Sequence, residues 1–471
     1  MYTSLLDSDV LAGSNNRRPA SLFIGMRGQL PVVVIVGGGL GGLAAAKALK
    51  RARANVILID RTNHHLFQPL LYQVATSVLT PGQIGSPIRN ILRKQKNTTV
   101  LMGEVTRVET AEQCVVVSDA DRAEVRLPYD YLVLATGATH SYFGHDEFKK
   151  HAPGLKTLAD AVAIRNRILS AFELAEAEED PRLHRDLLTF VLVGAGPTGV
   201  EMASAISVLV RGALRSEYRR IDPTSARIVL IDQSPRVLGS FSEDLSMAAK
   251  ERLTKLGVEV LNGQSVEHID EAGVIVGGER IASHTVIWTA GVKPSPAAKW
   301  LNAPADRAGR VRVEPDLRVP GHREIFVVGD TASLDQNGKP LPGVAQVAMQ
   351  QGRYAGRLIA RQIAGKPPLR PFRYFDKGNM AVVGKGYAVL QSGRVHVSGL
   401  LAWMVWAAIH LQFLATSSLR ISVFLQWVWT YLTGQRGSRL IVDHHGPEPA
   451  VTPDEPGTQL VNSLGGGFRV Q

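Results

Sequence analysis

One unit occurs twice in this sequence, about 157 residues apart: an apolar run, a glycine-rich turn and a segment that favours a helix. The first apolar run covers residues 31–36, and the second covers residues 190–193. Uninterrupted apolar runs of this length are typical of central parallel strands that are buried on both faces. The duplication therefore predicts an α/β fold that contains two Rossmann-like domains.

Both turns fit the pattern G-x-G-x-x-G, and the helix after the first turn is expected over Leu43–Arg51. Glycines at these spacings let the chain turn tightly and let a pyrophosphate approach the backbone. The pyrophosphate then lies at the start of the helix, where backbone N–H groups have no partner. We therefore expect one dinucleotide at each turn. The glycines are Gly37, Gly39 and Gly42 in the first turn, and Gly194, Gly196 and Gly199 in the second.

An aspartate ends the strand that follows each of these helices, Asp60 in the first unit and Asp232 in the second. A carboxylate at this position can accept hydrogen bonds from ribose hydroxyls. Asp232 lies 33 residues after Gly199, whereas about 20 is usual, so we expect a longer helix or an insertion before it. The Asp232 carboxylate would repel a 2′-phosphate and so favours NAD over NADP, but Arg236 nearby leaves NADP open.

A third apolar run, over residues 325–328, ends in Gly329 and Asp330, where the chain has returned to the first domain. An aspartate there can hydrogen-bond the ribityl hydroxyls of a flavin, a group that NAD does not have. We therefore expect FAD at the first turn and NAD(H) at the second. Two shorter runs close the two domains; the first ends in Ala135, Thr136 and Gly137, expected beside FAD, and the second ends in Gly291, expected beside NAD(H).

Changes in composition divide the chain. The first thirty residues carry Asp7 and Asp9 and lack the apolar core of a secretory signal. The sequence after Gly446 is rich in proline, glycine and acidic residues, which favours disorder. The expected organisation is a flexible extension over 1–29, an FAD-binding domain over 30–157 and again over 294–391, an NAD(H)-binding domain over 158–293, a membrane-associating helical segment over 392–442 and a disordered tail over 443–471.

Composition excludes several kinds of site. The single cysteine, Cys114, cannot form an intramolecular disulfide, a Cys-x-x-Cys redox pair or a Cys-rich metal site, and we expect it to pack in a strand. His64 and His65 are adjacent and do not converge on one ion, so no metal site is predicted. The net charge is +11, but no run of basic and aromatic residues indicates a nucleic acid partner.

Four segments, the second of which contains the second glycine turn, occur in a fixed order: His65–Ala75, Val193–Glu201, Val344–Gly352 and Tyr374–Gly378. Together with the two turns, they resemble the type II (alternative, non-electrogenic) NADH:quinone oxidoreductases, which belong to the pyridine nucleotide-disulfide oxidoreductase superfamily. The resemblance covers roughly residues 31–440. It implies an FAD-dependent enzyme that passes a hydride from NADH to FAD and two electrons to a membrane quinone, ubiquinone or menaquinone. With no set of charged membrane helices in the chain, proton pumping is not expected.

The resemblance also implies roles for particular residues. It places Gln68, Ala345 and Gln346 beside the flavin, and Glu201 near the nicotinamide, where it could relay protons. Gln346 and Gln350 are four residues apart and share one helix face, which the resemblance places against the flavin and the quinone. It places Lys377 near the isoalloxazine ring, where a cation would stabilise the reduced flavin.

Other members of the superfamily differ in ways that the sequence can test. Disulfide reductases need a cysteine pair and sulfide:quinone reductases need several cysteines, so one cysteine excludes both. Ferredoxin-type reductases share the two turns but lack the glutamine-rich helix and the aromatic C-terminal segment. A flavoprotein that reduces a protein acceptor in their manner, and a slow-turnover NADH sensor, stay open as alternatives.

Residues 399–417 carry no formal charge, and residues 421–432 are similarly apolar. We expect two helices that lie in the membrane interface, with Arg420, Arg436 and Arg439 directed to lipid phosphates. One spanning helix or a dry dimer interface are the alternatives. The expected location is peripheral (monotopic), on the cytoplasmic face of the cell membrane, and a homodimer is also expected. Four of the six tryptophans lie here: Trp403, Trp406, Trp427 and Trp429.

Overall fold

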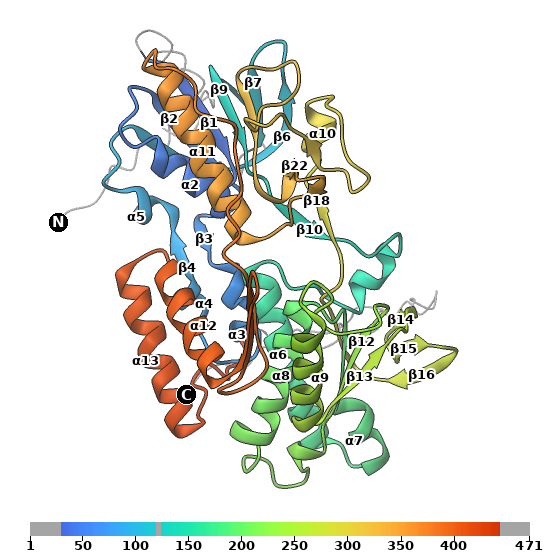
Figure 1. Cartoon of the computed structure of the whole chain (residues 1–471). Helices are drawn as coiled ribbons and strands as arrows, with labels where there is room; N and C mark the ends of the chain where they lie inside the picture. Colours follow the sequence, from blue (N-terminus) through green and yellow to red (C-terminus); the bar gives the residue numbers. More distant parts are fainter. Residues whose placement is uncertain (1–29, 119–123, 443–471) are drawn as a thin grey trace, which may run out of the picture.

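Two parallel sheets form the centres of the two nucleotide-binding units (Figure 1). The structure is a computed structural model, and it describes residues 30–118 and 124–442. The extension expected over 1–29 and the tail expected over 443–471 lie outside the described residues. The first sheet has the order β20-β9-β1-β2-β5, and the second has the order β13-β12-β11-β17.

All neighbouring strands in these two sheets run parallel. β1 and β11, the strands that precede the two glycine turns, are buried along their whole length. The α/β prediction is therefore confirmed. The first sheet consists of β1 (Val32–Val36), β2 (Asn55–Asp60), β5 (Thr98–Met102), β9 (Tyr131–Leu134) and β20 (Ile325–Val327); the second consists of β11 (Thr189–Val193), β12 (Arg227–Asp232), β13 (Val258–Asn262) and β17 (Thr285–Trp288).

Helix α2 (Leu40–Ala48) begins and ends three residues before the predicted helix over Leu43–Arg51. Its first turn contains Gly41 and Gly42, which the prediction had assigned to the loop. A side chain on Gly42 would overlap the carbonyl oxygen of Gly37, so glycine alone lets the helix pack this closely on the turn. The equivalent helix α8 (Pro197–Val208) has the same arrangement, with Gly199 against the carbonyl oxygen of Gly194.

The long gap before Asp232 is explained by an insertion. After α8 the chain continues into a π-helical turn, η4 (Leu209–Ala213), and then a short 3₁₀ turn, η5 (Pro223–Ser225), before it enters β12. The prediction of a longer helix or an insertion is confirmed.

Helix α11 (Ala345–Ile363) covers α2 on the side away from the sheet (Figure 1). A Cβ atom on Gly352 would overlap the carbonyl oxygen of Gly41, and one on Gly356 would lie 2.6 Å from the carbonyl oxygen of Ala45. The two helices therefore approach each other at backbone distance, and α2 is held between the sheet and α11.

The remaining described elements surround these layers. β10 pairs with β18 and links the two units, and Cys114 is buried in β7 as predicted. The strands are β3 (His64–Leu66), β4 (Gly85–Pro87), β6 (Glu104–Glu109), β7 (Cys114–Ser118), β8 (Glu124–Pro128), β10 (Ala138–His140), β14 (Val266–Asp270), β15 (Gly273–Val276), β16 (Glu279–Ala282), β18 (Val292–Pro294), β19 (Val311–Arg312), β21 (Ala332–Ser333), β22 (Asp335–Gln336) and β23 (Lys339–Pro340). The helices and short turns are η2 (Gln68–Leu70), α3 (Leu71–Ala75), α4 (Pro81–Ile84), α5 (Ile88–Leu92), η3 (Asp146–Lys150), α6 (Leu158–Ala177), α7 (Pro181–Leu187), α9 (Glu243–Lys255), α10 (Ala297–Trp300) and η6 (Gly329–Thr331).

The C-terminal part of the described chain consists of a three-stranded antiparallel sheet and two helices. They are β24 (Asn379–Val382), β25 (Ala388–Ser392), β26 (Val395–Gly399), α12 (Leu400–Phe413) and α13 (Ser417–Thr433). The expected domain boundary between residues 391 and 392 falls inside β25. Trp406 and Trp427 belong to the same apolar core as α3, α6 and α8, so the two helices are part of the body of the protein.

Of the three arginines that were expected to face lipid phosphates, Arg436 is buried, and for this residue the prediction is wrong; Arg439 is half-buried, and Arg420 is exposed. Arg436 is 4% exposed, and its guanidinium donates to the carbonyl oxygens of Thr76 (2.6 Å) and Ala205 (3.2 Å). Arg439 pairs with Glu217 at 2.7 Å, and Arg420 donates to the carbonyl oxygen of Leu414. Arg436 and Arg439 turn inward because α13 ends at the left-handed residue Gly434 (φ +73°), where the chain turns back toward the protein.

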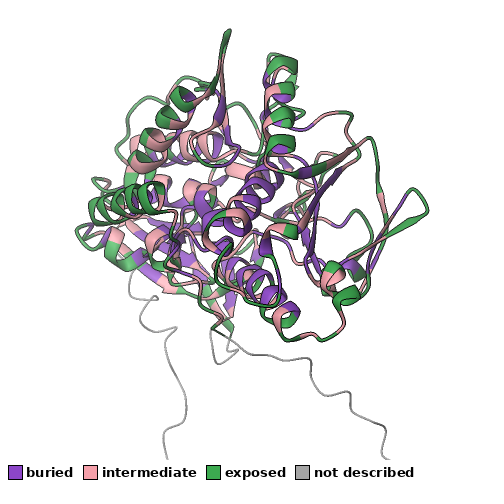
Figure 2. Ribbon diagram, turned by 90° about the horizontal axis from the view of Figure 1, so that it is seen from below, coloured by how far each residue is buried: buried purple, intermediate pink, exposed green. Residues whose placement is uncertain are grey.

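The outer side of α13 is apolar instead. Figure 2 shows buried residues gathered in the interior elements and exposed residues on the outer helices and loops. Within residues 30–118 and 124–442, no helix combines the length and the hydrophobicity that a membrane span needs. The exposed apolar residues of α13 recur every three or four positions and form one stripe: Ile421, Phe424, Leu425, Val428, Trp429 and Leu432.

The close contact of α11 with α2 makes a prediction about stability. We expect the thermal unfolding midpoint of Gly352→Ala to lie at least about 2 °C below that of Gly82→Ala, because overpacking costs about 1–3 kcal/mol and about 2–4 °C corresponds to 1 kcal/mol. The effect opposes helix propensity, which favours alanine by about 1 kcal/mol. The matched control is Gly82→Ala, a helical glycine with nothing within 4 Å of an added Cβ atom. Equal midpoints for the two variants would contradict the packing argument.

Candidate functional site

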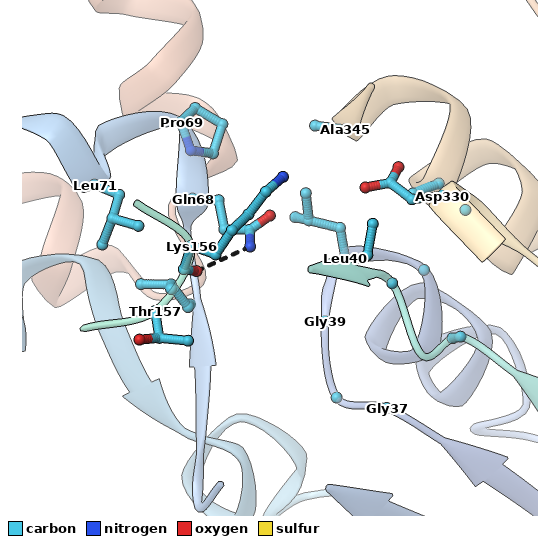
Figure 3. A pocket seen from close by; sticks show the side chains of 18 of the residues that line it. Gly37, Gly39, Leu40, Gln68, Pro69, Leu71, Lys156, Thr157, Asp330 and Ala345 are labelled. Atoms are coloured by element: carbon cyan, nitrogen blue, oxygen red, sulfur yellow. Dashed lines mark hydrogen bonds between the residues drawn. The ribbon is translucent and has the colours of Figure 1, made fainter. Parts of the chain in front are cut away.

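A cavity of about 480 Å³ lies at the carboxyl edge of the first sheet (Figure 3). β1, β9 and β20 run parallel and end at the same edge, which is where ligands bind in open α/β sheets. The cavity brings together residues that are far apart in the sequence. Of the residues predicted to bind FAD, those that line it are Gly37, Gly39, Asp60, Gln68, Ala135, Thr136, Gly137, Asp330 and Ala345.

Gly42 and Gln346 were also predicted beside FAD, but they do not line this cavity. Gly42 is buried under the turn, where it packs against Gly37. Its role is to let the helix approach the strand, so it supports the cavity without bordering it.

Asp60 and Asp232 hold the two glycine turns in the same way. Asp60 accepts hydrogen bonds from the backbone N–H of Gly38 (2.6 Å) and of Thr62 (2.7 Å). Asp232 accepts from the backbone N–H of Ala195 (2.5 Å) and of Ser234 (2.7 Å). In each unit, the carboxylate therefore holds the glycine turn at the start of the helix. The same pair of hydrogen bonds occurs in both units, as the internal duplication predicts.

The residues of the first cavity fit an FAD molecule. Gly37 has φ +102°, and nothing lies within 4 Å of a Cβ atom built on Gly39, so the space in front of the start of α2 is open for a pyrophosphate. Asp60 and Asp330 supply acceptors for ribose and ribityl hydroxyls, and apolar side chains suit an aromatic ring. These apolar residues are Leu40, Leu66, Pro69 and Leu71.

The second turn has the geometry that a second dinucleotide needs. Gly194 has φ +107°, and the space around a Cβ atom on Gly196 is open. Gly291 also has positive φ (+66°), and a side chain there would meet the ring of Phe143. Phe143 is 63% exposed, so its ring covers Gly291 from the solvent side.

Glu201 lies in the second turn of α8 and borders the large cavity. Its side chain is buried, and its carboxyl accepts one hydrogen bond, from the backbone N–H of Val382 at 3.3 Å. Burial raises the pKa of Glu201 to about 8, and the hydrogen bond from Val382 opposes this only in part. The group is therefore protonated at neutral pH, unlike an ordinary glutamate.

A second, mainly apolar cavity of about 200 Å³ lies under α12 and α13, and Glu201 and Tyr72 line both cavities. Gln73 donates to the Tyr72 hydroxyl (3.1 Å) and accepts from the Trp427 indole N–H (2.7 Å). Burial raises the pKa of Tyr72, with the Glu201 charge as a smaller cause. The other lining residues are Val78, Ser204, Ala205, Val208, Gly212, Val382, Gly384, Lys385, Trp403, Trp406, Thr430, Tyr431, Gly434 and Arg436.

Arg436 borders this second cavity as a buried cation. Burial lowers the pKa of Arg436 to about 9, and the charge of Arg439 adds to the effect. From the sequence, Arg436 was expected at the lipid surface because it follows an apolar helix. The sequence pattern does not indicate that the chain turns back toward the core at Gly434.

The two predicted catalytic glutamines engage the backbone of residues 375–378. Gln346 donates to the carbonyl oxygen of Gly378 (2.8 Å) and accepts from the N–H of Lys377 (3.2 Å). Gln350 donates to and accepts from the backbone of Phe375, at 2.9 Å and 3.0 Å. Both amides therefore hold this segment, and neither glutamine lines the large cavity.

Lys377 is likewise placed away from the cavity lining. Its Nζ atom lies 5.8 Å from the centre of the Phe413 ring, on α12. The residue that does bring an ammonium group to the large cavity is Lys156, which Figure 3 shows extending into it. No sequence signal indicated Lys156, since a lysine before a helix cap has no distinctive pattern.

Comparison with known proteins agrees with this geometry. The family model described as pyridine nucleotide-disulphide oxidoreductase matches residues 31–352. The chain is 46% identical over 422 residues to the type II NADH:quinone oxidoreductase Ndh of Mycobacterium tuberculosis, which covers 87% of this chain and 90% of the relative. It is 44% identical to NdhA of the same organism, with 87% and 89% covered. The solved structure of NDH2 from Plasmodium falciparum in complex with NADH has a TM-score of 0.80 at 20% identity, covering 88% of this chain and all of that one.

The family match spans both glycine turns and β20, the strand that precedes Asp330, and the two mycobacterial relatives each cover 87% of the chain. The resemblance drawn from the sequence motifs is therefore confirmed: this chain belongs to the type II NADH:quinone oxidoreductases, within the pyridine nucleotide-disulphide oxidoreductase family.

Proposed function

We propose that this protein is an FAD-dependent, non-proton-pumping NADH:quinone oxidoreductase that passes a hydride from NADH to FAD and two electrons to a membrane quinone. The observation that carries the proposal is the wall shared by the two cavities. Tyr72 and Glu201 separate a cavity that fits FAD from an apolar cavity under the C-terminal helices. A cofactor in the first cavity and an apolar electron acceptor in the second can therefore lie on opposite sides of the Tyr72 and Glu201 side chains.

The first cavity would hold FAD through the start of α2, with Asp60 and Asp330 at the hydroxyl groups and the 135–137 turn beside the cofactor. Bound FAD would supply the chemistry of accepting a hydride and giving up electrons one or two at a time. The second turn would hold NAD(H) through Gly194, Gly196 and Gly199, with Asp232 at the ribose. The protein's own task is to align two rings and exclude water.

Glu201 is placed to hold the proton that a quinone needs when it is reduced. Its carboxyl is protonated at neutral pH, since burial raises its pKa to about 8, and it borders the apolar cavity directly. Arg436, on the same cavity, would attract a carbonyl oxygen that gains negative charge. Gln346 and Gln350 act as positioning residues in this scheme, because their amides hold residues 375–378.

The apolar stripe of α13 is proposed to lie in the membrane interface, on the cytoplasmic face, so that a quinone can enter from the lipid. Amphipathic helices with aromatic residues bind in this way. We also propose a homodimer in which the two α13 anchors lie side by side on the membrane. A protein acceptor is less well matched, since the second cavity is small and mainly apolar.

Glu201→Gln should slow quinone reduction at least tenfold, because the amide cannot donate the proton that a general acid supplies. In the unaltered enzyme, turnover should fall as pH rises through about 8, where Glu201 loses its proton. This decline should be absent from the variant. Stopped-flow spectroscopy would follow the flavin band during reduction by NADH and reoxidation by quinone.

The matched control is Ser204→Ala, which borders the same cavity without a titratable group. If Glu201→Gln slows the NADH half-reaction and not the quinone half-reaction, Glu201 serves the nicotinamide and the proposed proton transfer is wrong.

Asp232→Asn should raise the preference for NADPH over NADH, expressed as the ratio of the two kcat/KM values, at least tenfold. The change removes the negative charge that repels a 2′-phosphate, and it keeps an oxygen for the Ala195 amide. Steady-state kinetics with both nucleotides would measure it. Asp60→Asn makes the same change at the first turn and should leave the ratio unaltered; a ratio that moves there and not in Asp232→Asn would reverse the assignment of the two nucleotides.

Replacing Leu425 and Trp429 by glutamate should weaken binding to lipid vesicles more than a hundredfold. Each buried apolar side chain contributes about 1.5–3 kcal/mol, and 1.4 kcal/mol corresponds to a factor of ten. Cosedimentation with phosphatidylcholine–phosphatidylglycerol vesicles would measure the loss. Glutamates at Thr433 and Gln435, which are exposed at and just after the end of the same helix and outside the stripe, control for the added charge. Unchanged sedimentation of the stripe variant would remove this surface from membrane binding.

A further inference from the structure

Lys156 places an ammonium group in the large cavity from a backbone that is fixed on both sides. Its N–H donates to the carboxylate of Asp160 (3.0 Å), and its carbonyl oxygen accepts from the Gln68 amide (3.1 Å). The next residue, Thr157, caps the start of α6. The side chain is then free to extend into the cavity, between the Gln68–Leu71 segment and Asp330 (Figure 3).

This ammonium group lacks a protein counter-charge at contact distance. Within residues 30–118 and 124–442, no carboxylate lies within 4.0 Å of the Lys156 amine. Burial lowers the pKa of Lys156, and the charge of Asp330 opposes this from a greater distance. Lys156 is partly buried, and a cation that is removed from water is costly unless it is paired, so the occupant of the cavity is expected to bring the negative charge.

We propose that Lys156 contacts the isoalloxazine ring of FAD and stabilises it when it is reduced and negatively charged. The inference rests on the proposed function, in which FAD occupies this cavity. The residues around Lys156 indicate that it contacts the isoalloxazine ring of FAD and not the pyrophosphate. Gln68, Pro69 and Leu71 border the cavity on the Lys156 side, whereas the start of α2, with its own free N–H groups, provides the pyrophosphate site.

The sequence resemblance gave this role to Lys377. The two lysines differ in where their amines lie: Lys377 contacts the ring of Phe413, and Lys156 lines the cavity. One cation beside a developing negative charge is sufficient to shift an ionisation or reduction equilibrium by a factor of ten to a thousand. The geometry therefore assigns the flavin cation to the segment before α6.

A cation beside the isoalloxazine ring stabilises the negatively charged reduced form of FAD more than the neutral oxidised form. Removal of the cation should weaken binding of reduced FAD and leave binding of oxidised FAD almost unaltered. The reduction potential of bound FAD must then fall, because binding and reduction form one thermodynamic cycle. A cation on the pyrophosphate would instead affect both states equally and leave the potential unaltered.

The test measures the midpoint potential of the purified FAD-loaded enzyme by equilibration with a reference dye, together with the dissociation constant of oxidised FAD. Lys156→Met should lower the equilibrium constant for flavin reduction at least tenfold, which is about 30 mV for a two-electron couple. The dissociation constant of oxidised FAD should change less than threefold. Lys156→Arg should keep the potential near that of the unaltered enzyme, because it keeps the charge. Lys156→Gln is a second neutral variant, should the methionine variant be unstable.

Two other lysines serve as controls. Lys150→Met removes an exposed lysine six residues earlier and should leave the potential unaltered, as should Lys377→Met. An unaltered potential in both neutral Lys156 variants, equal weakening of both redox states, or a shift in Lys377→Met alone would overturn the inference. Failure of the unaltered protein to bind FAD would instead overturn the proposed function.

Discussion

The fold depends on backbone contacts that only glycine permits. Gly42 allows α2 to rest on the carbonyl oxygen of Gly37, and Gly352 allows α11 to rest on the carbonyl oxygen of Gly41. α2 is thereby held between the sheet and a second helix, and its first N–H groups face the large cavity. The position of these donors is set by steric contact and not by flexible side chains. A phosphate site made in this way is rigid before any ligand binds.

The parallel strands, the two turns and the acids at Asp60 and Asp232 could all be predicted, because each follows from a local pattern with a strong physical cause. Buried strands read as apolar runs, and glycines at fixed spacing follow from the turn itself. The start of α2 was misplaced because glycine has low helix propensity, whereas here the contact with Gly37 overrides propensity. Type II NADH:quinone oxidoreductase membership was also evident from the motifs and is confirmed by relatives at 46% and 44% identity.

The directions of individual side chains could not be predicted from the sequence. Gln346 and Gln350 do share a helix face, but that face meets the backbone of residues 375–378. Arg436 follows an apolar helix, yet a left-handed Gly434 returns it to the core. Lys156 has no motif at all. In each case the outcome depends on a contact between segments far apart in the chain, which no local pattern encodes.

The C-terminal helices serve both the interior and the surface of the protein. Val423 and Trp427 of α13 face the core, and the Trp427 indole reaches Gln73 beside the cavities. Phe424, Leu425, Val428 and Trp429 face outward on the same turns. Since each residue of an α-helix advances it by about 100°, one inserted residue would rotate everything after it by that angle, and the residues beyond it would no longer meet the core. The residue count of α13, and not merely its hydrophobic character, is therefore constrained, so substitutions should be tolerated there far better than insertions or deletions.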